Sequence, residues 1–177
     1  MELKGSQTEK NLLAAFAGES QARNKYTYFA EAARKEGYHY IAKMFEESAE
    51  NEKQHAKNEF ELIDGIGDTI ANLKEAIGGE HHETVEMYPT FAKEAEVEGN
   101  AAATNLFRQI AKIEMHHRDR YKKLLEMVEA GTVFKREQPI KWKCSICGFT
   151  YEGTEPPPKC PCCKYTREYY EPANLDF

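Results

Sequence analysis

Two Glu-x-x-His motifs, 62 residues apart, constrain this chain of 177 residues more than any other feature of its sequence. The first motif is Glu52 and His55, and the second is Glu114 and His117. Each lies in the apolar stripe of a predicted helix, where side chains three residues apart share one face. A buried carboxylate is unfavourable unless it is paired or binds a cation. Two such helices facing each other would therefore hold two metal ions between them.

The same offset extends beyond the two motifs and indicates an internal repeat. The residues that recur 62 positions later are Tyr26, Phe29, Ala30, Ala33, Glu36, Gly37 and Phe45, which correspond to Tyr88, Phe91, Ala92, Ala95, Glu98, Gly99 and Phe107. Self-similarity of this extent indicates that one pair of helices has been used twice in the chain.

Capping residues and glycines predict the helix boundaries of the first half. A capping box formed by Ser6 and Glu9 predicts a long helix that ends near Gly37. A second helix is predicted to begin near His39 and to end before Asp64.

The second half has the same pattern with one addition. A short helix is predicted over 68–77, in front of Gly78 and Gly79. A long helix should then cover about 80–98, with a kink at Pro89, and another should cover 100–131. Four long helices in two hairpins, with one longer connection between the halves, predict a four-helix bundle.

The predicted ligands exceed the usual set of a dinuclear carboxylate bundle by one. Such bundles take one Glu from each of two helices and Glu-x-x-His from each of the other two. Glu19 supplies the first lone carboxylate, and the third helix offers both Glu80 and Glu83. Five carboxylates suit two ferric ions better than two ferrous ions, so we expect one ligand to exchange with the charge of the metal.

Carboxylate and imidazole ligands admit iron, manganese or zinc. Zinc has no redox chemistry, so iron fits an expandable ligand set best. Tyr26 and Tyr88 share the ligand stripes, and either hydroxyl could bind a ligand carboxylate. Most buried tyrosines, however, are simply packed with a hydrogen-bonded hydroxyl.

All five cysteines lie in the last 34 residues, which marks a second domain. We expect a bundle domain over 1–138, including a linker over 132–138, and a domain over 139–177 too small to fold without a metal. Two Cys-x-x-Cys pairs predict one tetrathiolate site, whose ligands are Cys144, Cys147, Cys160 and Cys163. A structural zinc ribbon is the alternative to a single iron there. A redox-active di-iron bundle needs an electron source, which favours iron.

The composition argues against several classes of protein. A net charge of −6 argues against nucleic-acid binding, which needs a basic surface. No apolar run approaches the roughly 18 residues of a membrane span. The N-terminus lacks the apolar core of a secretory signal, so a cytoplasmic location is expected.

The chain resembles rubrerythrins over essentially its whole length. The segments that carry the resemblance are 16–24, 52–55, 79–83, 87–89, 114–117 and 141–148. The resemblance implies a mainly α fold, in which a ferritin-like four-helix bundle precedes a small C-terminal rubredoxin-like metal-ribbon domain. It also implies a non-haem di-iron peroxidase of oxidative-stress defence, which reduces hydrogen peroxide to water with electrons relayed through the rubredoxin-like iron.

The resemblance further implies roles for individual residues. The ligands expected in both oxidation states are Glu19, Glu52, Glu80, Glu114 and His117. Glu83 and His55 match a pair that exchanges at one iron, Glu83 binding in the diferric state and His55 in the diferrous state. Tyr26 and Tyr88 match tyrosines beside the ligands, and we count all four of these residues as catalytic.

The implied partners are hydrogen peroxide as substrate, rubredoxin or an NAD(P)H-dependent reductase as electron donor, and a second copy in a head-to-tail homodimer. Two features depart from the family: the connector over 65–79 is short, and Cys162 is an extra thiol. Iron storage or ferroxidase activity on the same bundle is the alternative function, and a non-enzymatic metal-stabilised module is a third.

Overall fold

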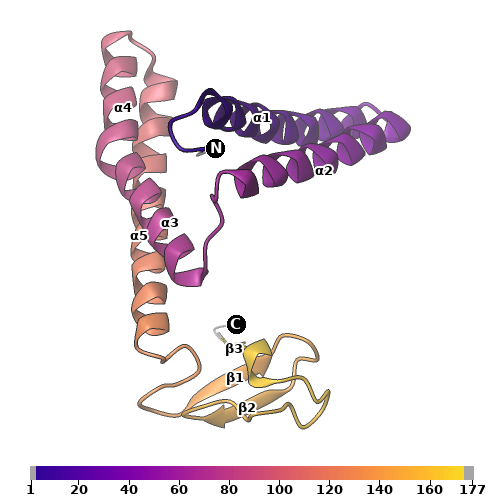
Figure 1. Ribbon diagram of the computed structural model, residues 1–177, viewed down its shortest axis with the longest axis vertical. Helices are drawn as coiled ribbons and strands as arrows, with labels where there is room; N and C mark the ends of the chain where they lie inside the picture. The colour runs from indigo at the N-terminus through magenta and orange to yellow at the C-terminus, as the bar shows by residue number, and fades with distance from the viewer. Residues whose placement is uncertain (1–2, 174–177) are drawn as a thin grey trace. The chain divides into compact units, whose positions relative to one another are not determined.

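The computed structural model describes residues 3–173, which form two compact units that meet in the sequence at Gly67 and Asp68. The N-terminal unit, up to Gly67, is a hairpin of α1 (Gln7–Lys35) and α2 (His39–Leu62), drawn side by side in Figure 1. The C-terminal unit contains all the remaining helices and a small sheet.

Local signals account for the ends of α1 and α2. The Ser6 hydroxyl accepts a hydrogen bond from the Glu9 N–H at 3.1 Å, as the predicted capping box requires. The chain leaves α1 through Gly37 at φ 88°, a conformation that glycine adopts without strain. Both predicted helices of the first half are confirmed.

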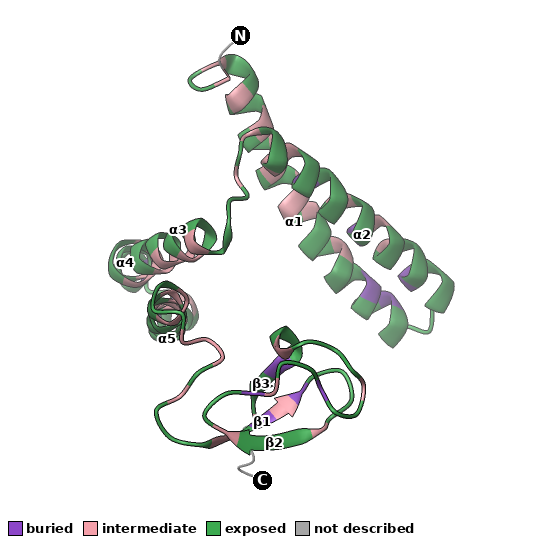
Figure 2. Ribbon diagram, turned by 60° about the horizontal axis from the view of Figure 1, so that its bottom comes forward, coloured by how far each residue is buried: buried purple, intermediate pink, exposed green. Residues whose placement is uncertain are grey.

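Small residues set the close contact between α1 and α2, shown in purple in Figure 2. Every buried residue in the described part of this unit is an alanine: Ala30, Ala33, Ala42, Ala49 and Ala56. The larger apolar side chains stay at least partly exposed, because a hairpin of two helices has no second layer to cover them.

Three helical segments follow one another without a break at the start of the C-terminal unit. They are α3 (Thr69–His82), the π-helical turn η1 (Glu83–Met87) and α4 (Tyr88–Val97). Helix α5 (Ala101–Glu129) packs along α3 and α4. The prediction of a helix end before Gly78 and Gly79 is wrong, since both glycines lie inside α3.

The π turn explains this error. At an offset of 61 rather than 62 residues, α3 repeats the first half of α1, with Asn11, Leu12, Ala15, Gly18 and Glu19 recurring as Asn72, Leu73, Ala76, Gly79 and Glu80. A π turn accommodates one extra residue in a helix, and here the Tyr88 N–H donates to the Glu83 carbonyl five residues back. The offset therefore changes from 61 to 62 across η1. The turn ends just before Pro89, which donates no backbone hydrogen bond, at the position of the predicted kink.

The repeat is also visible in the packing of aromatic rings. The two sets are Tyr26, Phe29 and Phe45 in the N-terminal unit, and Tyr88, Phe91 and Phe107 in the C-terminal unit. The tyrosine ring lies 6.1 Å from the phenylalanine of the second helix in both sets, centroid to centroid. The corresponding distances between the two phenylalanines are 5.6 and 5.7 Å.

One ion pair of the repeat is conserved in position but reversed in sign. Arg34 of α1 pairs with Glu46 of α2. At the equivalent positions, Glu96 of α4 pairs with Arg108 of α5 at 2.7 Å. All four side chains are about half exposed, so each pair contributes less than about 1 kcal/mol.

The small sheet has three antiparallel strands in the order β2-β1-β3, and a short 3₁₀ turn (Arg167–Tyr169) precedes the last of them. The strands are β1 (Ile140–Cys144), β2 (Thr150–Gly153) and β3 (Tyr170–Pro172). The predicted class, mainly α with a small C-terminal domain, is confirmed. The boundary between 1–138 and 139–177 stays a prediction.

Within residues 3–173, the structure contains no helix that is both long and apolar enough to cross a membrane.

The alanine contact between α1 and α2 generates a prediction. Ala42 is fully buried, so Ala42→Leu should lower the free energy of unfolding by about 1–3 kcal/mol through overpacking. Ala32 is an exposed alanine of the same hairpin, and Ala32→Leu should change stability by less than about 0.5 kcal/mol. Chemical denaturation of the iron-loaded proteins measures both. Equal effects of the two substitutions would contradict the assignment of the contact.

Candidate metal centres

One predicted ligand group lies in the N-terminal unit. Glu19 projects from the middle of α1, and Glu52 and His55 project from facing positions on α2. The three side chains bring possible ligand atoms within 4.8 Å of one another. His55 Nδ1 lies 2.8 Å from Glu52 Oε2, and the His55 side chain is 55% exposed.

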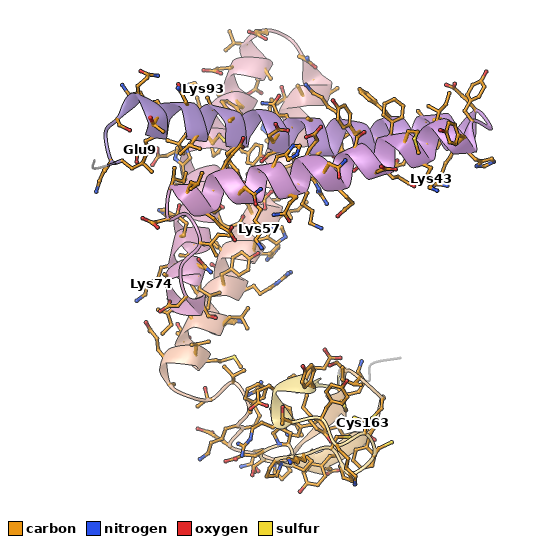
Figure 3. The ribbon with its side chains drawn as sticks, turned by 45° about the vertical axis from the view of Figure 1, so that its right-hand side comes forward. Glu9, Lys43, Lys57, Lys74, Lys93 and Cys163 are labelled. Carbon is orange, nitrogen blue, oxygen red and sulfur yellow. The ribbon has the colours of Figure 1, made fainter. Side chains whose placement is uncertain are left out.

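The repeat-equivalent group lies in the C-terminal unit. Glu80 near the end of α3 meets Glu114 and His117 of α5, again with ligand atoms within 4.8 Å of one another. His117 Nδ1 lies 2.6 Å from Glu114 Oε2 and 3.7 Å from Glu80 Oε2. The ion pair between Lys74 of α3, labelled in Figure 3, and Glu129 of α5 joins the same two helices at 3.2 Å.

The paired carboxylates in each group repel each other. A hydrogen bond shared with Glu52, followed by burial, raises the pKa of Glu19. Burial, followed by the hydrogen bond and charge of Glu114, raises the pKa of Glu80. Glu80 Oε2 is buried and has no hydrogen-bond partner within the described residues. A metal ion would remove both the repulsion and the unpaired oxygen, so the donors fit a cation.

Glu83 and Tyr88 flank the C-terminal group. Glu83 is the first residue of the π turn and lies outside the group of residues within 4.8 Å of one another among those described. Burial, and then the charges of Glu83 and Glu114, raise the pKa of Tyr88. The phenol therefore keeps its proton at neutral pH and can donate a hydrogen bond to a carboxylate.

The analysis of the sequence missed Glu59. It lies seven residues after Glu52, two helical turns along the same face of α2. Its Oε2 atom is buried without a hydrogen-bond partner in the described part of the chain, and its charge contributes to the raised pKa of Glu19. The spacing from Glu52 could have revealed it.

The third group comprises the four predicted cysteines: Cys144, Cys147, Cys160 and Cys163. The sulfur atoms of Cys144 and Cys163 lie 3.7 Å apart, and those of Cys147 and Cys160 lie 3.6 Å apart. Four thiolates at about 2.3 Å from one metal ion form a tetrahedron whose edge is about 3.8 Å. The sulfur positions therefore fit a single tetrahedral ion. Cys162 is exposed and lies outside the group.

Two similar turns hold the four sulfurs. In each turn the residue after the second cysteine lies in the left-handed region, Gly148 at φ 76° and Lys164 at φ 67°. The Gly148 N–H donates to the Cys144 carbonyl at 2.8 Å, and the Lys164 N–H donates to the Cys160 carbonyl at 3.0 Å. Two chain reversals of the same form thus face each other, as two Cys-x-x-Cys turns require.

The four thiols do not titrate alike. Burial opposes ionisation of Cys160, but hydrogen bonds from backbone N–H groups and from the Tyr170 hydroxyl outweigh it and lower the pKa of Cys160 to about 6. A backbone hydrogen bond from Phe149 favours the Cys147 thiolate. Burial and the three neighbouring thiols outweigh that bond and raise the pKa of Cys147 to about 12. Without a metal, four thiolates cannot share this site.

The cysteines also form much of the core of the small sheet domain, in which Figure 3 labels Cys163. Its buried residues are Trp142, Cys144, Cys160 and Tyr170. The Trp142 ring nitrogen donates to the Gly153 carbonyl at 2.9 Å, and the Arg136 guanidinium lies 5.2 Å from the Trp142 ring. Because two of the four buried residues are candidate ligands, we expect the domain to depend on its metal.

Comparison with known proteins gives matches over both parts of the chain. Residues 10–125 match the rubrerythrin family model, and residues 142–171 match the model of the rubrerythrin rubredoxin-like domain. The chain is 46% identical to a rubrerythrin of Porphyromonas gingivalis, covering 99% of this chain and 94% of that protein. It is 46% identical to a putative rubrerythrin of Methanocaldococcus jannaschii, covering 93% and 92%. A solved structure of nigerythrin in a partially reduced state is 32% identical, covers 97% of this chain and 89% of that one, and gives a TM-score of 0.37.

The four-sulfur geometry predicts different outcomes for neighbouring cysteines. Cys147→Ser should abolish the visible thiolate-to-iron absorption of the anaerobically purified protein and lower its iron content, because a tetrahedral ligand is lost. Cys162→Ser is the matched control and should leave both unchanged, since Cys162 is exposed and lies outside the group. Loss of the absorption in Cys162→Ser, or zinc alone in the wild-type site, would contradict the assignment.

Proposed function

Because the chain belongs to the rubrerythrin family, as two family models and full-length relatives show, we propose that it is a peroxidase that reduces hydrogen peroxide to water. The family predicted from the sequence is confirmed. The predicted cofactors are confirmed as well, since the chain carries the residues of a ferritin-like di-iron site and a four-cysteine rubredoxin-like site.

One observation carries the proposal: two kinds of metal site stand in one chain. Reduction of hydrogen peroxide to two water molecules consumes two electrons and two protons. When bound, two iron ions supply the electron pair that cleaves the O–O bond, and the single thiolate-bound iron passes electrons on one at a time. The pairing of a two-electron site with a one-electron site matches this reaction.

Side chains of this chain would position the substrate and its protons. Tyr88 holds its proton beside Glu80 and Glu114, so its hydroxyl can orient a carboxylate or a bound peroxide. Tyr26 occupies the repeat-equivalent position in the other hairpin, with the same aromatic neighbours. We assign both tyrosines to the positioning of ligands and substrate.

We also propose that Glu83 and His55 exchange as ligands of one iron. The two histidines differ in exposure, since the His55 side chain is 55% exposed and that of His117 is 36% exposed. His55 is therefore less confined and better suited to leave a metal. Glu83 opens the π turn, and π turns recur at functional sites because the extra residue redirects a side chain.

The proposal includes an electron donor, a location and an assembly. We assign the donor to rubredoxin or an NAD(P)H-dependent reductase, acting on the four-cysteine site. A cytoplasmic location agrees with cysteines that form no disulfide among the described residues and keep their thiols. A head-to-tail homodimer would bring the thiolate site of one copy to the di-iron centre of another.

Iron storage with ferroxidase activity is the second candidate, because the same bundle serves both chemistries. A storage protein needs no dedicated electron donor, so the rubredoxin-like domain argues against it. Storage would show as iron accumulating far beyond three ions per chain when ferrous iron and oxygen are supplied.

Turnover tests the proposed function. The reduced full-length protein should oxidise once with peroxide, and with a reductase-coupled donor it should continue to consume peroxide. Cys147→Ser should retain the single oxidation but lose at least about 10-fold in steady-state rate, because electrons no longer reach the carboxylate site. Cys162→Ser should keep the wild-type rate. Undiminished turnover in Cys147→Ser would rule out the relay.

Ligand exchange predicts variants that depend on oxidation state. Glu83→Ala should weaken the diferric form, because it removes negative charge where the metal charge is highest. His55→Ala should chiefly disturb the diferrous form and slow the next reaction with peroxide. Glu114→Ala should impair both forms, and losses of about 10–100-fold or more in affinity are expected. Crystal structures of the peroxide-oxidised and dithionite-reduced protein decide the matter, since identical ligands at both irons in both states would disprove the exchange.

A further inference from the structure

The connector between the two units is short, and its first part folds back on α2. It comprises residues 63–68, between the last residue of α2 and the first residue of α3. Asp64 lies in the left-handed region at φ 54°, and the Gly65 N–H donates to the Phe60 carbonyl at 2.9 Å. A side chain at position 65 would clash with the Phe60 ring, so this reversal is held by packing.

A ferritin-like bundle needs one long crossover connection, because its second and third helices run in parallel. Glu52 lies ten residues before the end of α2, about 15 Å, and Glu80 lies eleven residues after the start of α3, about 17 Å. To bring both carboxylates level in parallel helices, the connector would have to span about 32 Å.

The connector cannot reach that far. The seven steps from Leu62 to Thr69 extend to about 25 Å at most. Only four of these steps follow the reversal at Gly65, which leaves about 14 Å of reach. The far end is anchored too, because Asp68 caps α3 by accepting a hydrogen bond from the Ala71 N–H at 2.8 Å.

Each hairpin is also incomplete in the same way. Phe29 is 47% exposed and its repeat equivalent Phe91 is 40% exposed, and the equivalent pair Met44 and Leu106 is likewise exposed. Each ligand group offers two carboxylates and one imidazole, which is half of a dinuclear ligand set. An apolar face and half a metal site thus recur in each unit.

We infer that the di-iron centre is built between two copies of this chain, the α1–α2 hairpin of one copy packing against helices α3 to α5 of the other. Exchange of equivalent elements between protomers is a low-cost route to a dimer, and short hinges favour it. Each dimer then holds two di-iron centres. One copy supplies Glu19, Glu52 and His55 to a centre, and the other supplies Glu80, Glu83, Glu114 and His117.

Two complementary variants test this arrangement. Glu19→Ala/Glu52→Ala destroys the half-site of the N-terminal unit, and Glu80→Ala/Glu114→Ala destroys that of the C-terminal unit. Expressed together with different affinity tags and purified through both tags, they give a mixed dimer. In an exchanged dimer one centre combines the two intact hairpins, so the mixed dimer should hold half the wild-type content of di-iron sites, while each variant alone should hold none.

Pairing of the hairpins within each chain, as in an all-antiparallel bundle, gives the opposite result. Every centre of the mixed dimer would then contain one damaged half-site, and no di-iron centre would form, which would overturn the inference. The readout is iron content above that of the four-cysteine sites, together with the absorbance of the diferric centre. It does not depend on peroxidase activity, so failure of the proposed function would leave it unaffected.

Two further measurements keep the inference testable if the variants form no mixed dimer. A wild-type monomer that carries a full di-iron centre in sedimentation analysis would overturn it directly. Insertion of about 20 Gly and Ser residues after Ile66 provides ample chain to span the bundle and should yield iron-loaded monomers. A lengthened protein that remains entirely dimeric would contradict the limit set by the connector.

Discussion

Repulsion between paired carboxylates governs the helical part of this protein. Packing of α1 on α2 places Glu19 against Glu52, and packing of α3 on α5 places Glu80 against Glu114. The raised pKa values of Glu19 and Glu80 show that, without metal, a proton is favoured in each pair. A metal ion displaces that proton and attracts both carboxylates, so metal binding and the packing of the helices stabilise each other. The hairpins thus arrange their ligands in advance and depend on a cation to relieve the resulting strain.

Much of this could be predicted from the sequence, because the decisive features are local or periodic. The Glu-x-x-His pairs lie one helical turn apart, and the Cys-x-x-Cys pairs each lie within one tight turn, so spacing alone brings their side chains together. The capping residues Ser6 and Asn100 begin α1 and α5 where expected. The repeat then relates one hairpin to the other, and the aromatic sets around Tyr26 and Tyr88 agree to within tenths of an ångström.

What could not be predicted depends on contacts between distant residues or on a single shift of register. Gly78 and Gly79 suggested a helix end, yet tertiary packing on α5 keeps both inside α3, and the second of them matches Gly18 in the middle of α1. A search at one fixed offset misses this match, because the π turn adds a residue between Glu80 and Tyr88. Glu59 was missed because burial of its carboxylate is decided by packing against α1 rather than by its neighbours in the sequence.

The reversed ion pair has a consequence for folding. A chain with an internal duplication risks pairing a helix with the wrong partner, since α1 and α4 offer similar surfaces to both α2 and α5. In such a mispaired hairpin Arg34 would face Arg108, and Glu96 would face Glu46. The native pairings replace these two repulsions with two attractions, which biases each nascent helix towards its neighbour in the sequence. After the duplication, an exchange of charge between two surface positions thus became a label that distinguishes one half of the molecule from the other.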